Sequence, residues 1–191
     1  MKIYSVGLAL GFFCFVFVAC QSNQKKDKNP ETDLRKMIEQ APGINKGSGT
    51  YTIQAPDGWT EGDTTVSGAK LTTIKSPSDG PEDNFMENIT VVTEDSKGYD
   101  LNSYTSTNRK NMNTQLENLN FLSEENLTIG SVAAKAVVYS FSYSGFALKN
   151  TAYFLVKDNI GYVITCTAQS KTFDQFQPAF KKCVNSFLIK G

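Results

Sequence analysis

Four cysteines carry the clearest chemical signals in this chain of 191 residues, which contains no histidine. Cys14 and Cys20 lie six residues apart at the end of an apolar run, whereas Cys166 and Cys183 lie near the C-terminus. The absence of histidine excludes a Ser-His-Asp triad, a histidine-containing zinc site and an imidazole switch near neutral pH. The cysteines therefore suggest covalent modification or disulfide formation rather than catalysis.

The other reactive residue types do not form a recognisable catalytic motif. The chain has no nucleophile elbow, no Ser-x-x-Lys and no glycine-rich phosphate loop. Its 19 basic and 19 acidic residues balance, so a nucleic acid is not an expected partner. We therefore expect a protein that is not an enzyme, uses no cofactor and works as a monomer.

Two loops collect carboxylates, which are the oxygen ligands that calcium prefers. Neither group has the spacing of an EF-hand loop, so solvated side chains are the favoured interpretation and no metal site is predicted. The first group is Asp57, Glu61 and Asp63, and the second is Asp79, Glu82 and Asp83.

The N-terminal run from Ile3 to Cys20 has no charged residue and is long enough to cross roughly 30 Å of hydrocarbon as a helix. An uncleaved anchor is therefore one interpretation. Lys2, the apolar core and the small Ala19 are instead typical of a signal peptide. The sequence Phe-Val-Ala-Cys at 17–20 resembles the lipobox of bacterial lipoproteins, with Phe17 where leucine is usual.

This resemblance implies that residues 1–19 are a signal peptide and that Cys20 is acylated and becomes the first mature residue. Acyl chains on Cys20 would anchor the protein to a cell membrane. We expect the outer membrane or a periplasm-facing surface if the bacterium is Gram-negative. Residues 20–49 are mostly polar and are predicted to form a flexible tether. Residues 33–40 could form a short helix within it. Residues 50–191 are expected to form one domain.

The sequence of the first half of that domain predicts three strands followed by a helix. Residues 51–55 alternate apolar and polar side chains, and residues 69–77 and 87–95 are rich in β-branched residues. A helix is predicted from Leu101 to Leu116, with Asp100 as its N-cap and a narrow apolar stripe that would lie on a sheet.

Four more strands and a terminal helix complete the pattern. The strand-like segments lie at 121–130, 133–145, 150–159 and 161–170, and the short turns between them indicate antiparallel neighbours. Thr172 and Gln175 have the spacing of a capping box. Because Pro178 disfavours a helix interior, the helix either kinks at this residue or begins there, and we favour a turn at 173–176 followed by a regular helix from Pro178.

Four short motifs carry a resemblance to the PsbP-like superfamily: "APDGW" at 55–59, "ENITV" at 87–91, "GYVITCTA" at 161–168 and "CVNSF" at 183–187. The resemblance implies an α+β fold, an antiparallel sheet with helices packed on its faces. This agrees with the six or seven strands expected from the residues themselves. Function does not follow from such a fold alone.

Aromatic residues and the remaining cysteines complete the candidates. Trp59, the only tryptophan, is either a binding surface or a plug of the core, and the second is favoured. The stripe of Tyr139, Phe141 and Tyr143 is likewise favoured as core over ligand surface. Cys166 and Cys183 are expected to be neighbours and are candidates for a disulfide, with buried thiols as the alternative.

Two functions remain open. The first is a lipid-anchored, non-enzymatic interaction or accessory module that binds another component of the cell envelope, with an envelope protein as its partner. The second is a carrier for a small apolar ligand held between sheet and helix. A large lined cavity would favour the carrier.

Overall fold

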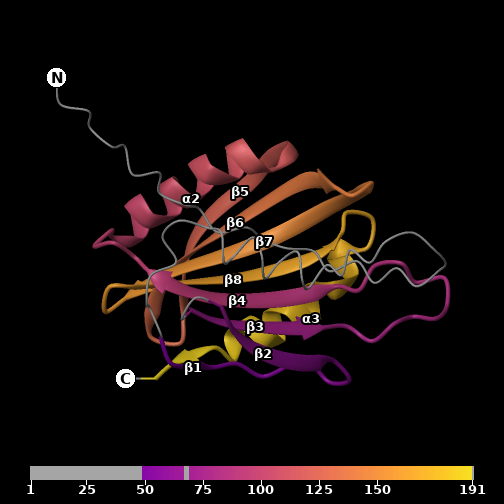
Figure 1. The fold of residues 1–191 in the computed structure, drawn as a ribbon, viewed down its shortest axis with the longest axis horizontal. Helices are drawn as coiled ribbons and strands as arrows, with labels where there is room; N and C mark the ends of the chain where they lie inside the picture. The colour runs from indigo at the N-terminus through magenta and orange to yellow at the C-terminus, as the bar shows by residue number, and fades with distance from the viewer. Residues whose placement is uncertain (1–48, 67–68, 191) are drawn as a thin grey trace.

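Four consecutive strands joined by two-residue turns make up the larger part of the sheet (Figure 1). The structure is a computed structural model that describes residues 49–66 and 69–190. The predicted signal peptide, Cys20, the short helix and the tether up to residue 48 lie outside these residues. The four strands are β5 (Glu117–Ile129), β6 (Val132–Tyr143), β7 (Phe146–Lys157) and β8 (Ile160–Gln169).

The turns explain why these strands were predictable. Asp158 and Asn159 between β7 and β8 have φ of 54° and 60°, and Ser144 and Gly145 between β6 and β7 have φ of 48° and 85°. Positive φ at both central residues gives a turn whose twist matches that of the flanking strands. Each strand is therefore antiparallel to the next, as expected.

Three earlier strands extend the sheet on the other side of β8. They are β2 (Thr60–Val66), β3 (Ala69–Lys75) and β4 (Asn88–Asp95), and the strand order is β2-β3-β4-β8-β7-β6-β5. All neighbouring strands are antiparallel, including β4 and β8, which pair from Asn88 opposite Thr167 to Asp95 opposite Ile160. The seven-stranded antiparallel sheet confirms the predicted α+β class.

One helix covers each face of the sheet (Figure 1). Helix α2 (Leu101–Gln115) lies on β6 and β7, and its buried Tyr104 and Met112 join one hydrophobic cluster with Tyr139 and Phe154. The Asp100 side chain accepts a 2.7 Å hydrogen bond from the Ser103 amide, which confirms the predicted N-cap. Among the described residues, no helix combines the length and apolar character needed to cross a bilayer.

Helix α3 (Phe173–Asn185) lies on β8 on the opposite face, and it differs from the prediction. It is continuous from Phe173 and contains Pro178, so the predicted separate turn at 173–176 is wrong. Phe173 and Phe180 are both buried in a second hydrophobic cluster, on the face of the sheet that carries α3. Their burial stabilises the first turn of the helix although Pro178 has no N–H to donate to it.

The predicted capping box is also wrong. The Thr172 side chain does not cap α3 and instead donates hydrogen bonds of 3.4 Å to Glu87 Oε1 and 3.3 Å to the Gln169 carbonyl.

The two ends of the domain pair with each other outside the main sheet. β1 (Tyr51–Thr52) and β9 (Leu188–Ile189) form a two-stranded sheet. The strand predicted at 51–55 is therefore shorter than expected and is not part of the seven-stranded sheet. The Tyr51 ring packs against Phe187 at a centroid distance of 5.3 Å. Strand β2 was not predicted because Val66 is the only apolar residue in its sequence "TEGDTTV".

Candidate binding groove between α2 and strand β5

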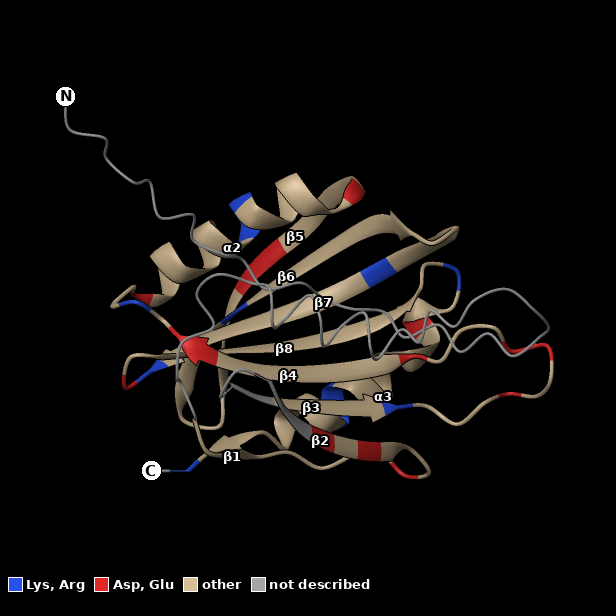
Figure 2. Cartoon of the chain, viewed as in Figure 1, with Lys and Arg blue, Asp and Glu red and all other residues tan. Residues whose placement is uncertain are grey.

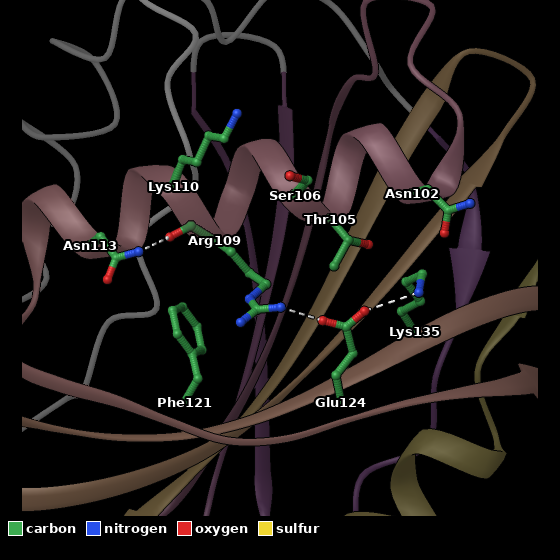
Figure 3. Close-up of a pocket in the computed structure, with 9 residues that line it drawn as sticks. All are labelled: Asn102, Thr105, Ser106, Arg109, Lys110, Asn113, Phe121, Glu124 and Lys135. Carbon is green, nitrogen blue, oxygen red and sulfur yellow. Dashed lines mark hydrogen bonds and ion pairs between the residues drawn. The ribbon is translucent and has the colours of Figure 1, made fainter.

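A groove of about 410 Å³ runs between α2 and the strands β5 and β6 (Figure 3). Helix α2 forms one wall and the edge of the sheet forms the other. The lining is mostly polar or charged and contains one aromatic ring: Asn102, Thr105, Ser106, Arg109, Lys110, Asn113, Phe121, Glu124 and Lys135.

The helical wall follows from the spacing of polar residues in α2. Asn102, Ser106, Arg109 and Asn113 recur every three or four residues and therefore lie along one side of the helix. The Asn113 side chain donates a 3.3 Å hydrogen bond to the Arg109 carbonyl and so stays against the helix. This polar side of α2 faces β5 across the groove.

A β-bulge builds the opposite wall. Phe121 and Glu124 are three residues apart, so a regular strand would place them on opposite faces. The register shifts between Phe121, which pairs with Tyr139, and Ser123, which pairs with Val138. The extra residue turns Glu124 to the same face as Phe121, because its partner Val137 lies two residues from Tyr139.

Helix α2 carries basic segments and β5 carries acidic ones (Figure 2). Glu124 on β5 is held between two cations that come from different elements (Figure 3). Arg109 Nη1 lies 2.6 Å from Glu124 Oε2, and Lys135 Nζ lies 3.0 Å from Glu124 Oε1. The hydrogen bond from Lys135, opposed by partial burial and followed by the charges of Lys135 and Arg109, lowers the pKa of the Glu124 carboxyl. Glu124 is therefore ionised at neutral pH and fixes both cations in the groove.

The Arg109 side chain is also fixed by stacking. Its Cζ lies 4.3 Å from the centroid of the Phe121 ring, a geometry that favours a cation on an aromatic face. Phe121 in turn packs edge-on against Tyr139 at 6.2 Å. The guanidinium is therefore oriented by both a carboxylate and an aromatic ring.

The groove carries a net positive charge, since Arg109, Lys110 and Lys135 stand against the single carboxylate of Glu124. Lys110 is exposed beside the fixed pair. A guanidinium has five N–H donors in a planar fork, so Arg109 can bind a second carboxylate while it keeps its bond to Glu124. The arrangement suits recognition of an anionic group.

The residues proposed from the sequence lie elsewhere in the fold. Trp59 packs edge-on against Phe176 and Phe180, at 6.2 and 6.0 Å, beside the cluster under α3. Tyr139 and Phe141 are buried in the cluster under α2, and Tyr143 packs against it. Only Tyr139 approaches the groove, through its contact with Phe121.

The loop carboxylates hold local structure rather than a common centre. Asp57 forms a 2.8 Å ion pair with Lys182, and Asp63 accepts a 2.5 Å hydrogen bond from Thr72. Asp83 accepts hydrogen bonds from the amides of Asp79 and Phe85. Across residues 49–66 and 69–190, no group of acidic or cysteine side chains is arranged to hold a metal ion.

Cys166 on β8 and Cys183 on α3 are both buried in the cluster under α3, and both are reduced. The disulfide considered from the sequence is therefore not formed in the structure. Burial raises the pKa of the Cys183 thiol to about 12, so this thiol is a weak nucleophile.

Comparison with known proteins agrees with the architecture. LpqN of Mycobacterium tuberculosis, described as involved in cell envelope biogenesis, aligns over 79% of this chain and 87% of its own, with 14% identity and a TM-score of 0.60. PA94 of Pseudomonas aeruginosa, a protein of unknown function, aligns over 75% and 99%, with 18% identity and a TM-score of 0.58.

CyanoP, the cyanobacterial PsbP of Synechocystis sp. PCC 6803, aligns over 76% of this chain and 96% of its own, with 13% identity and a TM-score of 0.52. At these identities the likeness shows the fold alone. No curated protein matches the chain significantly in sequence.

The sequence itself places the chain in a family. The family model described as PsbP-like protein matches residues 20–189, which include every described strand and helix. This match confirms the resemblance carried by the four short motifs. The chain belongs to the PsbP-like protein family.

Proposed function

We propose that this protein is a lipid-anchored component of a bacterial cell envelope that binds another envelope protein and catalyses no reaction. The observation that carries the proposal is the groove between α2 and β5, where Glu124 and Phe121 hold Arg109 in place beside Lys110 and Lys135. A site whose cations are already oriented loses less conformational entropy when an anion binds.

The partner segment that fits this groove is acidic. Aspartate or glutamate side chains would reach the remaining donors of Arg109 and the exposed ammonium of Lys110. The chain as a whole is neutral, so the positive groove would give the partner a defined place to bind rather than a general attraction.

A carrier of an apolar ligand is less well supported by this groove. An apolar molecule in it would take Arg109 and Lys135 out of water without offering them hydrogen bonds. Burial of uncompensated charge is costly, so the lining favours a polar and anionic occupant.

The membrane anchor rests on the sequence around Cys20 and is consistent with the envelope role in the description of LpqN. If residues 21–48 behave as flexible coil, their reach is on the order of 30 Å by the square-root law for such chains. That reach would let the groove meet a partner above the lipid headgroups.

Membrane fractionation and intact mass spectrometry test the anchor. We expect the native protein in the membrane fraction, with a mass that corresponds to acylated Cys20 and no residues 1–19. The Cys20→Ser variant should leave the membrane or fail to be processed, while Cys14→Ser should behave as native. A mature protein that retains residues 1–19 contradicts the anchor.

A matched pair of charge reversals tests the groove. Lys110 on α2 and Lys181 on α3 are both exposed helix lysines, but only Lys110 lines the groove. We expect Lys110→Glu to reduce co-purification of an envelope protein from detergent extracts, and Lys181→Glu to leave it unchanged. Binding should also weaken as salt rises. Equal effects of the two variants would contradict a groove-specific contact.

A further inference from the structure

Strand β5 is the last strand of the seven-stranded sheet on the side of the groove (Figure 1). Among residues 49–66 and 69–190, β6 is the only strand that hydrogen-bonds to it. About half of the backbone N–H and C=O groups of an antiparallel strand point away from a given neighbour, so those of β5 face outwards without a strand partner. With 13 residues, β5 offers a longer edge than β2, which has seven residues and ends the sheet on the other side.

The middle of β5 has solvent on both faces and along its edge. Residues 122–126 are all exposed, whereas β8 inside the sheet is buried over nearly its whole length. Helix α2 packs on β6 and β7 and so leaves the outer side of β5 uncovered. From Ser123 to Ile129 the register with β6 has no further shift after the bulge. This stretch is therefore a regular edge that can accept another strand.

The two faces of this stretch differ in charge. Side chains alternate along a strand, so Glu124 faces α2 and Glu125 faces the other side, where its cross-strand partner Ala136 belongs to the cluster under α3. On the α2 face, the two positive charges of Arg109 and Lys135 outweigh the single charge of Glu124. On the other face, Glu125 is exposed and negative. A strand that complements this edge therefore carries acidic residues on its α2 face and basic residues on the other.

The same glutamates disfavour pairing with a second copy of the chain. Two β5 strands that pair antiparallel about Glu124 or about Glu125 would place that glutamate directly opposite its own copy, and like charges in this position are destabilising. Charged side chains on edge strands commonly prevent such self-association. A strand with complementary charges does not meet this repulsion, so the edge of β5 favours a different chain over its own copy.

We infer that the envelope partner binds as an added strand on the outer edge of β5, through an extended segment in which acidic and basic residues alternate. Its acidic side chains face α2 and bind the remaining donors of Arg109, while its basic side chains face Glu125. Backbone hydrogen bonds to β5 supply affinity, and the alternation of charge supplies specificity. This inference rests on the proposed function, because it specifies how the acidic segment of the partner lies at the groove.

Two capped peptides of identical composition test the alternation of charge. One alternates aspartate and lysine over eight residues, and the other has four aspartates followed by four lysines. Calorimetry with the full mature protein in detergent measures both affinities. We expect the alternating peptide to bind about tenfold more tightly, since only it can pair each charge with its complement on β5. No binding of the alternating peptide would overturn the inference. Equal affinities that Lys110→Glu still reduces would also overturn it, while they leave the acidic partner of the groove standing.

Hydrogen exchange, read by mass spectrometry, locates the bound peptide. At saturation with the alternating peptide, we expect slower amide exchange in β5 over residues 123–129, because outward N–H groups gain acceptors there. Strand β2, the opposite edge of the same sheet, is the control and should be unchanged. The same peptide with every amide N-methylated keeps its charges but cannot pair as a strand, and should give no protection. An unchanged β5, or equal protection by the methylated peptide, would overturn the inference.

Glu125→Lys and Glu82→Lys are a matched pair of charge reversals. Both glutamates are exposed, but only Glu125 lies on the edge strand. We expect Glu125→Lys to weaken binding of the alternating peptide about fivefold, because like charges then face each other, and Glu82→Lys to leave it unchanged. Glu125 does not line the groove, so an acidic segment held by the groove alone would bind Glu125→Lys at least as tightly as the native protein. That result would overturn the added strand and leave the proposed function intact.

Discussion

The Tyr104 hydroxyl donates a 2.6 Å hydrogen bond to Glu94 Oε1 and so ties helix α2 to strand β4. Both side chains are buried, and the Tyr104 ring also packs edge-on against Phe154 at 6.2 Å. Because Tyr104 lies five residues before Arg109 on the same helix, this contact helps to set the position of the helical wall of the groove.

Because of the Glu94 carboxyl, we expect the protein to become less stable as pH rises from about 4.5 to 7. Burial, opposed by the Tyr104 hydrogen bond and the charge of Lys97, raises its pKa from 4.5 to about 7. In that window the unfolded chain releases a proton that the folded protein keeps, so the free energy of unfolding falls as pH rises. The full loss is about 3 kcal/mol, reached above pH 7. Urea unfolding at a series of pH values measures it.

Glu94→Gln is the matched variant, because its amide oxygen can still accept from Tyr104. We expect the variant to lose most of this pH dependence and to keep only that of other carboxyls, such as Glu87, whose pKa burial also raises. A native protein whose stability is constant or rises from pH 4.5 to 7 would contradict the assignment.

Gly161 on β8 is predicted to be essential for the close packing of α2 against the sheet. A Cβ atom at this position would lie 2.4 Å from the Tyr104 ring, which real atoms do not tolerate. Gly161→Ala should therefore lower the free energy of unfolding by about 1–3 kcal/mol, the usual range for overpacking. Gly62→Ala on β2 is the control, since a Cβ there meets no atom within 4 Å. Equal stability of the two variants in thermal unfolding would refute the close contact.

Pro178 is predicted to weaken α3, because it removes one backbone hydrogen bond from the helix interior. Pro178 is exposed, so Pro178→Ala restores the N–H without opening a cavity. We expect the variant to be more stable by on the order of 1 kcal/mol, less than the full proline penalty because the unfolded chain also gains freedom. The neighbouring Gln177→Ala should change the unfolding midpoint much less. A destabilised Pro178→Ala would contradict this prediction.

Thiol labelling tests the state of Cys166 and Cys183. Both are buried and reduced, and a raised pKa disfavours the thiolate of Cys183, which is the reactive form. We expect a thiol reagent to modify neither residue in the native protein and both in urea without reductant. Only unfolded chains that remain unlabelled until they are reduced would show that a bridge forms in the exported protein.

The strands from β5 to β8 could be predicted because their signals are local. Ser144-Gly145 and Asp158-Asn159 are turn pairs between alternating apolar runs, and each hairpin follows from its own few residues. The N-cap at Asp100 is local in the same way. β2 could not be found, since its polar sequence is a strand only because it pairs with β3.

The groove could not be predicted because it depends on long-range register. Arg109 lies on a helix and Glu124 on a strand, and they meet only because the bulge after Phe121 turns Glu124 towards α2. The pairing of Asn88 with Thr167 likewise joins β4 to β8, with a helix and three strands between them in the sequence. The polar spacing along α2 was visible, but the surface opposite it was not.

Photo-crosslinking in native membranes tests the central claim most directly. A photoreactive residue at Asn113, which lines the groove, is compared with one at Lys181 on α3, and adducts are identified by mass spectrometry. We predict that position 113 yields an adduct with one envelope protein through an acidic segment, that Lys110→Glu reduces this adduct, and that position 181 does not form it. The same adducts from both positions, or no protein adduct from position 113 in the membrane-anchored protein, would contradict the proposed function.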